Sequence, residues 1–175
     1  MGSGDLVGLI CSMFGRRVTA DQAREILHAT FPLTVRPGSF VCREGEEAPG
    51  LLIFLRGTAE VVKQSRDGTD RLIAVVEAPT VLGEMSLLTR RRHSASVRAT
   101  TDCELRLFRR PDLTRLLESE SVMAYKVVAT IAEVLARRLW LMDEKVLELA
   151  AERNRPNPVE ELAAFRDKLF SEWSF

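Results

Sequence analysis

The sequence VLGEMSLLTRRRHSASV, residues 81–97, carries the most informative pattern of the chain. Gly83 and Glu84 stand between a strand-like run and the short helical turn SLL. The first backbone N–H groups of such a turn can hold an anion. A carboxylate beside a bound anion repels it, unless the carboxylate accepts hydrogen bonds from hydroxyl groups of the same ligand. The pattern therefore suggests a sugar phosphate, and the alternative is a plain loop between two strands.

Short β-type runs separated by turn signals surround this stretch, from Leu33 to Phe108. Their spacing is typical of an antiparallel jelly roll or barrel. Asp67-Gly68, between two of these runs, predicts a hairpin turn. Further glycines fall where a tight turn calls for a positive φ, namely Gly38, Gly45 and Gly57. The chain is therefore expected to be mainly β, with helices flanking the strands.

Helical periodicity lies on both sides of the β region. Residues 5–31 form two helical pieces separated near Gly15, and Thr19 is the expected N-cap of the second piece. After the last strand, Pro111 fits the first turn of a short helix.

A long helix follows, capped by Ser119 or Ser121 and running to about Ala151. Apolar residues recur along it at steps of three and four, at Ala124, Val128, Ile131, Leu135, Leu139, Met142, Val146 and Leu149. A second line widens this face, at Val127, Val134 and Leu141. A β domain of this size covers only part of such a helix, so we expect a parallel homodimer through residues 121–151. The alternative is a helix packed wholly on its own barrel.

The sequence RNRPNP, residues 153–158, ends this helix. We therefore expect one domain over residues 5–151 and a short helical extension over residues 152–175. The extension is amphipathic, with Leu162, Phe165, Leu169, Phe170 and Trp173 on or near one side. A partner protein can dock on that side.

Acidic and basic residues balance, with 25 of each and a formal charge of zero. This balance argues against direct DNA binding and against an anionic membrane partner, because such binders usually carry a basic excess. Residues 86–115 depart from it, since eight arginines stand there against three carboxylates, a charge of +5. The run Arg90–Arg92 in this segment is either a solvated loop or a patch for an anion or a partner.

Composition also limits the compartment and the chemistry. The cysteines, Cys11, Cys42 and Cys103, lack CxxC spacing and predict reduced, buried thiols in a cytoplasmic protein. We expect no membrane span and no signal peptide. The two histidines, His28 and His93, are too few for a zinc or non-haem iron enzyme. No catalytic arrangement has convincing spacing, so we expect no enzyme and no metal site.

Residues 81–97 resemble the phosphate-binding cassette of the cyclic-nucleotide-binding domain superfamily. The shared pattern is Gly-Glu, an apolar and a small residue, Leu-Leu, and then Ser-Ala-Ser-Val, and the turn glycines named above also match. Residues 136–150, ARRLWLMDEKVLELA, are similar to the dimerising helix of the bacterial catabolite activators. The resemblance spans residues 20–150. It implies a double-stranded β-helix (jelly-roll) barrel with N-terminal helices and a long C-terminal dimerisation helix.

The resemblance also assigns roles to single residues. Groups that contact the cyclic phosphate are matched by Gly83, the backbone amides of Met85 and Ser86, and the small residues Ser94 and Ala95. Glu84 matches the acceptor of the ribose 2′-OH. The implied ligand is cAMP or cGMP, and no cofactor is required.

The sequence departs from the family at several positions. His93 stands where the family has an arginine that pairs with the phosphate, and Arg92 stands where many members have a proline. Met142 and Asp143 occupy helix positions at which the catabolite activator faces the purine with hydroxyl residues. Replacing a bidentate arginine by an imidazole weakens binding by about 10-fold to 150-fold. Arg91 or Arg92 swinging in, or a protonated His93, can compensate.

We therefore expect a dimeric regulatory sensor module that signals nucleotide occupancy to an unidentified partner protein. Catabolite activators carry a helix-turn-helix DNA-binding domain after the long helix, and the 24 residues after Ala151 are too few for one. The alternative is a ligand-independent interaction or scaffold module, which keeps the fold and has lost nucleotide binding. In that alternative His93 fills the vacated pocket.

Overall fold

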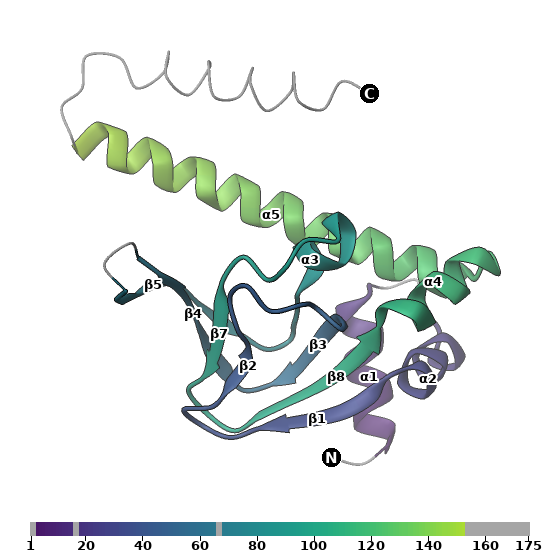
Figure 1. The fold of residues 1–175 in the computed structure, drawn as a ribbon. Helices are drawn as coiled ribbons and strands as arrows, with labels where there is room; N and C mark the ends of the chain where they lie inside the picture. The colour runs from purple at the N-terminus through teal and green to yellow at the C-terminus, as the bar shows by residue number, and fades with distance from the viewer. Residues whose placement is uncertain (1–2, 16–17, 66–67, 153–175) are drawn as a thin grey trace. The chain divides into compact units, whose positions relative to one another are not determined.

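The computed structural model describes residues 3–15, 18–65 and 68–152. The strands are β1 Phe31–Val35, β2 Phe40–Cys42, β3 Gly50–Arg56, β4 Thr58–Gln64, β5 Asp70–Glu77, β6 Thr80–Leu82, β7 Ser96–Ala99 and β8 Cys103–Arg109. They form two four-stranded antiparallel sheets, with the orders β1-β8-β3-β6 and β2-β7-β4-β5 (Figure 1). The predicted mainly β jelly roll with flanking helices is confirmed.

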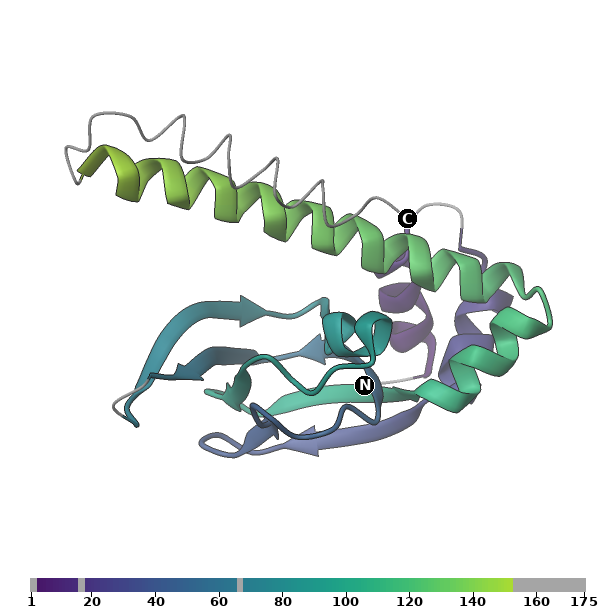
Figure 2. The same cartoon turned by 45° about the horizontal axis from the view of Figure 1, so that its top comes forward.

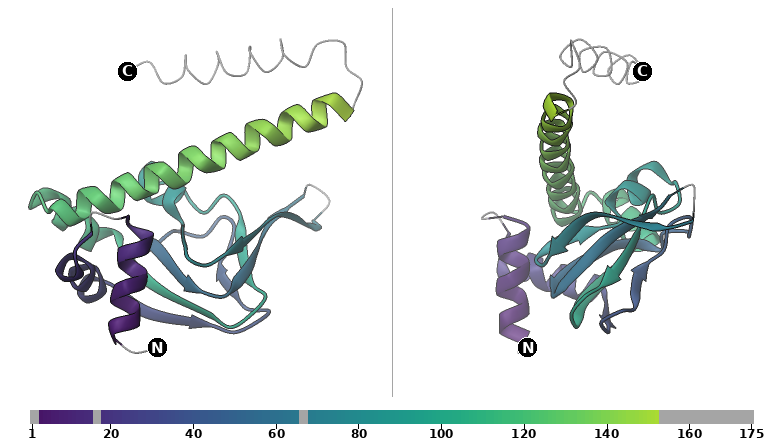
Figure 3. Two further views of the ribbon diagram at one scale, coloured as in Figure 1. Left: turned by 180° about the vertical axis from the view of Figure 1, so that it is seen from behind. Right: turned by 90° about the vertical axis from the view of Figure 1, so that its left-hand side faces the viewer.

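The helices are α1 Ser3–Met13, α2 Ala20–Ala29, α3 Glu84–Thr89, α4 Arg110–Glu118 and α5 Val122–Glu152. α1 and α2 lie next to each other at the end of the sheets away from the β4–β5 hairpin (Figures 2 and 3). The chain divides into two units, residues 1–134 and 135–175, and α5 begins in the first and continues into the second.

The core of the first unit lies between the two sheets. Its fully buried members come from both sheets and are Val35, Leu52, Phe54, Ala59, Leu82, Val97, Ala99, Cys103 and Leu105. β3 is buried on both faces, because Leu51 and Ile53, which alternate with the core residues, are also buried. This explains why the sequence of β3, GLLIFLR, is an apolar run and not an alternating one.

Helix caps lie where the sequence predicts them. Thr19 caps α2 in a capping box with Gln22. Pro111 lies in the first turn of α4. The Ser121 hydroxyl accepts a hydrogen bond of 3.2 Å from the Met123 N–H at the start of α5, so Ser121 and not Ser119 is the capping residue.

The predicted turns are also present. β4 and β5 pair as the expected hairpin, in which Gly68 has a φ of +83°. Asp67, the other half of that turn signal, lies outside the described residues. Positive φ angles are found at the remaining predicted glycines, Gly38, Gly45 and Gly57, and also at Gly15, near which the two N-terminal helices separate.

The cysteines are free thiols, but only Cys103 is buried, while Cys11 and Cys42 are half-buried. The expectation of burial is therefore correct for one of them. Among the described helices, none combines the length and the apolar character that crossing a membrane requires. The predicted helix within residues 152–175 lies outside the described residues.

The apolar stripe of α5 changes from buried to exposed along the helix. In the first unit Ala124 and Ile131 are fully buried. In the second unit Leu139 is 45%, Met142 60% and Val146 40% exposed. Most of the predicted stripe beyond residue 134 is therefore accessible in a single chain.

Candidate functional site

The predicted cassette begins at the junction of β6 and α3. Gly83 is the N-cap of α3 and has a φ of +77°, a left-handed conformation that glycine adopts at little cost. Its carbonyl accepts a hydrogen bond of 3.0 Å from the Leu87 N–H. The amides of Met85 and Ser86 lie in the first turn of this helix, where backbone N–H groups have no partner within the helix. The strand–glycine–helix arrangement predicted from the sequence is thus present.

Side chains of the same turn point in opposite directions. Glu84 is only 3% exposed and Ser86 is also buried, whereas the Met85 side chain is half exposed. A carboxylate buried at the first position of a helix is favourably placed, because the helix N-terminus carries partial positive charge. Glu84 is therefore held at the start of α3, away from open solvent.

His93 lies in the loop between α3 and β7, and its side chain is 6% exposed. The loop is fixed to the turn before β3 by two backbone hydrogen bonds of 2.9 Å, from the Gly45 N–H to the His93 carbonyl and from the His93 N–H to the Glu46 carbonyl. A β-carbon built on Gly83 would lie 3.4 Å from Cε1 of His93. The structure therefore brings His93 and Gly83 together, as the resemblance implies.

Burial sets the charge of the imidazole. Desolvation lowers the pKa of His93 below its ordinary value of 6.5, and the nearby carboxylates of Glu46 and Glu84 oppose this effect without cancelling it. Without a ligand, His93 is therefore mainly neutral at pH 7.

The same two carboxylates, Glu46 and Glu84, act on the thiol of Cys42, whose pKa is raised to about 11, chiefly by burial. A hydrogen bond with the Val97 backbone works against that rise.

The other predicted residues are more dispersed. Ser94 is exposed and Ala95 half-buried, in the turn that leads into β7. Arg92 directs its guanidinium to the turn before β3, where Nη1 donates to the Gly45 carbonyl at 2.9 Å. Met142 and Asp143 are exposed residues of the second unit, so their role toward a base stays a prediction.

Some residues near the cassette were missed from the sequence. Glu46 and Cys42 share the electrostatic environment of His93. The sequence signal that could have pointed to Glu46 is the turn glycine beside it, Gly45. Arg110 donates from Nη1 to the Leu87 carbonyl and from Nη2 to the Ser86 carbonyl, at 2.9 and 2.8 Å. No sequence pattern predicts these bonds, because their acceptors are backbone atoms of a distant turn.

Within the described ranges, His, Cys, Asp and Glu side chains do not gather in a group of three or more that could hold a metal ion. The chemistry available around Gly83 is thus that of hydrogen-bond donors, one buried carboxylate and one imidazole. Such a set is chemically suited to an anion that carries hydroxyl groups.

Comparison with known sequences agrees with this geometry. The cyclic nucleotide-binding domain family matches residues 32–120. The cGMP-dependent protein kinase egl-4 of Caenorhabditis elegans is 32% identical over 92 residues, which cover 53% of this chain and 11% of the kinase. The lysophospholipase NTE1 of Chaetomium globosum is 28% identical over 131 residues, which cover 73% of this chain and 9% of that protein. The chain thus spans about a tenth of the length of these relatives.

Solved structures share the fold. A cyclic nucleotide-binding domain from Methylobacillus flagellatus aligns with a TM-score of 0.77 at 21% identity, over 84% of this chain and 85% of that chain. The catabolite activator protein of Thermus thermophilus aligns with a TM-score of 0.65 at 24% identity, over 79% of this chain and 63% of that chain. The fold expected from the resemblance to catabolite activators is therefore confirmed.

Proposed function

The chain belongs to the cyclic nucleotide-binding domain family, and we propose that it is a regulatory sensor module that binds a cyclic nucleotide at Gly83–Ser86. The observation that carries this proposal is the left-handed Gly83 at the start of α3, followed directly by the buried Glu84. In this proposal the amides of Met85 and Ser86 hold the cyclic phosphate, beside the small residues Ser94 and Ala95. Glu84 accepts a hydrogen bond from the ribose.

His93 makes this binding depend on pH. A neutral imidazole offers one N–H donor, whereas an imidazolium offers two donors and a positive charge to the phosphate. A bound phosphate therefore raises the pKa of His93 from its lowered ligand-free value, and binding takes up a proton. The affinity for a cyclic nucleotide is expected to increase as the pH falls from 8 to 5.5.

Titration calorimetry of the whole chain with cAMP and with cGMP over this pH range tests the proposal. His93→Arg restores a permanent cation, so it is expected to tighten binding about 10-fold to 150-fold and to remove the pH dependence. His28→Arg is the matched control, because His28 is an exposed residue of α2. A wild-type affinity that does not change across the pH range contradicts the proposal. Absence of binding by both the wild type and His93→Arg also contradicts it.

The alternative function is a ligand-independent interaction module. It is favoured by the position of His93, which is buried, mainly neutral and packed close to Gly83. Thermal unfolding with cAMP, cGMP and cyclic dinucleotides separates the two functions, since a ligand at 100 times its Kd stabilises the folded state by about 2.7 kcal/mol. Absence of any shift supports the interaction module.

Signalling is proposed to pass through α5. The exposed apolar residues Leu139, Met142 and Val146 support a homodimer through this helix. The dimer would transmit the nucleotide-bound state of the domain to a partner protein. The free cysteines support the proposed cytoplasmic location. The catalytic activities named for the two relatives belong to much longer proteins, and we propose none for this domain.

A further inference from the structure

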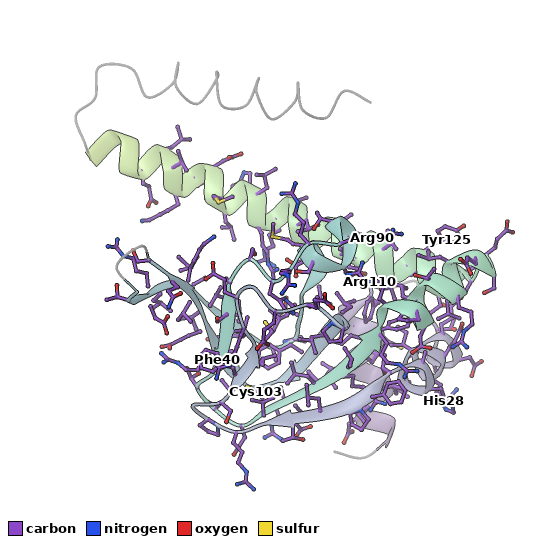
Figure 4. All side chains as sticks on the ribbon, viewed as in Figure 1. His28, Phe40, Arg90, Cys103, Arg110 and Tyr125 are labelled. Carbon is purple, nitrogen blue, oxygen red and sulfur yellow. The ribbon has the colours of Figure 1, made fainter. Side chains whose placement is uncertain are left out.

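Four arginines surround a cavity beside the proposed nucleotide site. Arg90, Arg91 and Arg92 come from the loop after α3, and Arg110 comes from the start of α4. Figure 4 labels Arg90 and Arg110. Glu47 and Ala48, from the loop before β3, complete a lining around about 440 Å³. Of the residues assigned to the nucleotide, only Arg92 lines this cavity. We call it the arginine cavity.

The arginine cavity is lined by four of the eight arginines of residues 86–115. The other four arginines of that segment are bound elsewhere, Arg98 to Glu60, Arg109 and Arg115 to Asp112, and Arg106 to Thr30 and to the Leu27 carbonyl. Their bonds, between 2.7 and 2.9 Å long, fix strands and helices of the fold. The +5 segment therefore divides into structural arginines and the four of the cavity.

The cavity arginines are weakly compensated. Nη2 of Arg92 lies 4.0 Å from the Glu47 carboxylate, with both side chains mostly exposed, and such a pair contributes little. The partners of Arg110 are neutral carbonyl oxygens, which leave its charge in place. For Arg90 and Arg91, the described part of the chain supplies no carboxylate partner. Four arginines and one glutamate thus line the cavity.

We propose that the arginine cavity binds a compact polyanion with two or more linked phosphate groups. Guanidinium forks bind the oxygens of phosphates and carboxylates two at a time, and a phosphate group offers the cavity more negative charge and more acceptor oxygens than a carboxylate does. A single phosphate would leave part of the positive charge unmatched, whereas a diphosphate carries about three negative charges at pH 7. The volume of the cavity lies in the range of small-molecule sites, about 300–1,000 Å³. This inference does not depend on nucleotide binding at Gly83.

Calorimetric titration of the whole chain with inorganic pyrophosphate tests the proposal. Binding is expected, with an affinity that falls as NaCl is added. The double variant Arg90→Gln/Arg91→Gln is expected to weaken pyrophosphate binding at least about 10-fold, since each lost arginine–phosphate pair removes a charge-assisted hydrogen bond. Arg36→Gln/Arg71→Gln is the matched control, because both residues are exposed, lie outside the cavity and change the net charge equally. The control is expected to bind like the wild type.

Several results would overturn the proposal. One is the absence of any binding heat with pyrophosphate. Another is an equal loss of pyrophosphate affinity in both double variants, which would indicate a general attraction to surface arginines. Displacement of pyrophosphate by excess cAMP would place it in the cassette and not in the cavity. ADP is the second probe: tighter binding of ADP than of pyrophosphate identifies a nucleotide as the source of the diphosphate, and equal or weaker binding identifies the free anion.

Discussion

The imidazole of His93 lies against Gly83, so that a β-carbon on Gly83 would be 3.4 Å from Cε1 of the histidine and 3.2 Å from the Gly50 carbonyl oxygen. The left-handed backbone of Gly83 is a second reason why a side chain is unfavourable at this position. A substitution or a movement at the start of α3 would therefore contact the His93 imidazole directly.

Gly83→Ala is expected to lower the free energy of unfolding more than Gly38→Ala does. Both glycines have φ near +80°, but nothing lies within 4 Å of a β-carbon at Gly38. The two variants share the backbone cost of about 1–2 kcal/mol. Crowding against the Gly50 carbonyl oxygen, 3.2 Å from this β-carbon, adds about 1 kcal/mol at Gly83 alone. Urea unfolding measures both variants, and equal losses of stability would contradict this close approach.

Stability is expected to depend on pH through His93. Its pKa in the folded chain lies below the ordinary value of 6.5, so the unfolded chain binds the proton more readily. The full contribution of the neutral imidazole is therefore present above pH 6.5 and is lost as the pH falls through the lowered folded-state pKa. Urea unfolding from pH 8 to 5 should show this loss in the wild type and in His28→Gln. The loss should be smaller in His93→Gln, and identical profiles would refute the assignment.

Cys42 is expected to alkylate slowly in the folded protein. With its pKa raised from 9.0 to about 11, the thiolate fraction at pH 8 falls from about 10% to about 0.1%. Iodoacetamide labelling followed by mass spectrometry should therefore be about 100-fold faster in urea than in buffer. Glu46→Gln should speed the reaction of the folded protein, because Glu46 helps to raise this pKa. Glu47→Gln, the neighbouring exposed residue, should leave the rate unchanged.

Local patterns were sufficient to predict the fold. Gly83-Glu84 at the end of a strand, Thr19 before a helix and Pro111 at a helix start each act within one turn of backbone, and each lies where predicted. The double-stranded β-helix arrangement was what the resemblance implied, and no order of the strands was predicted.

The electrostatics of the site could not be predicted, because they depend on contacts between distant segments. The neutral state of His93 results from its burial, opposed by Glu46 from a loop far away in the sequence. Arg92 reaching the phosphate was one of the possible compensations for His93 and stays a prediction, and in the structure its Nη1 donates to the Gly45 carbonyl. Arg106 was counted with the anion-favouring segment, yet it fastens β8 to the end of α2.

Arg90→Gly is expected to stabilise the fold and to weaken pyrophosphate binding. Arg90 has a φ of +57° at the end of α3, a conformation that costs a residue with a side chain about 1 kcal/mol. Glycine removes this cost and also removes one cation of the cavity. Glu120→Gly is the matched control, because Glu120 has a φ of +55° and lies outside the cavity. Both variants should raise the urea midpoint, but only Arg90→Gly should reduce the affinity for pyrophosphate.

The last prediction concerns the exposed face of α5. Leu139 and Val146 lie seven residues apart, so they share one side of the helix, and both are exposed in the single chain. If this side forms the homodimer, Leu139→Glu/Val146→Glu places like charges in the interface, and light scattering should report a monomer. Arg137→Glu changes the charge equally but lies on another side of the helix, so it should remain dimeric. A wild-type chain that is monomeric at micromolar concentration would contradict the dimer, and signalling would then need a different route.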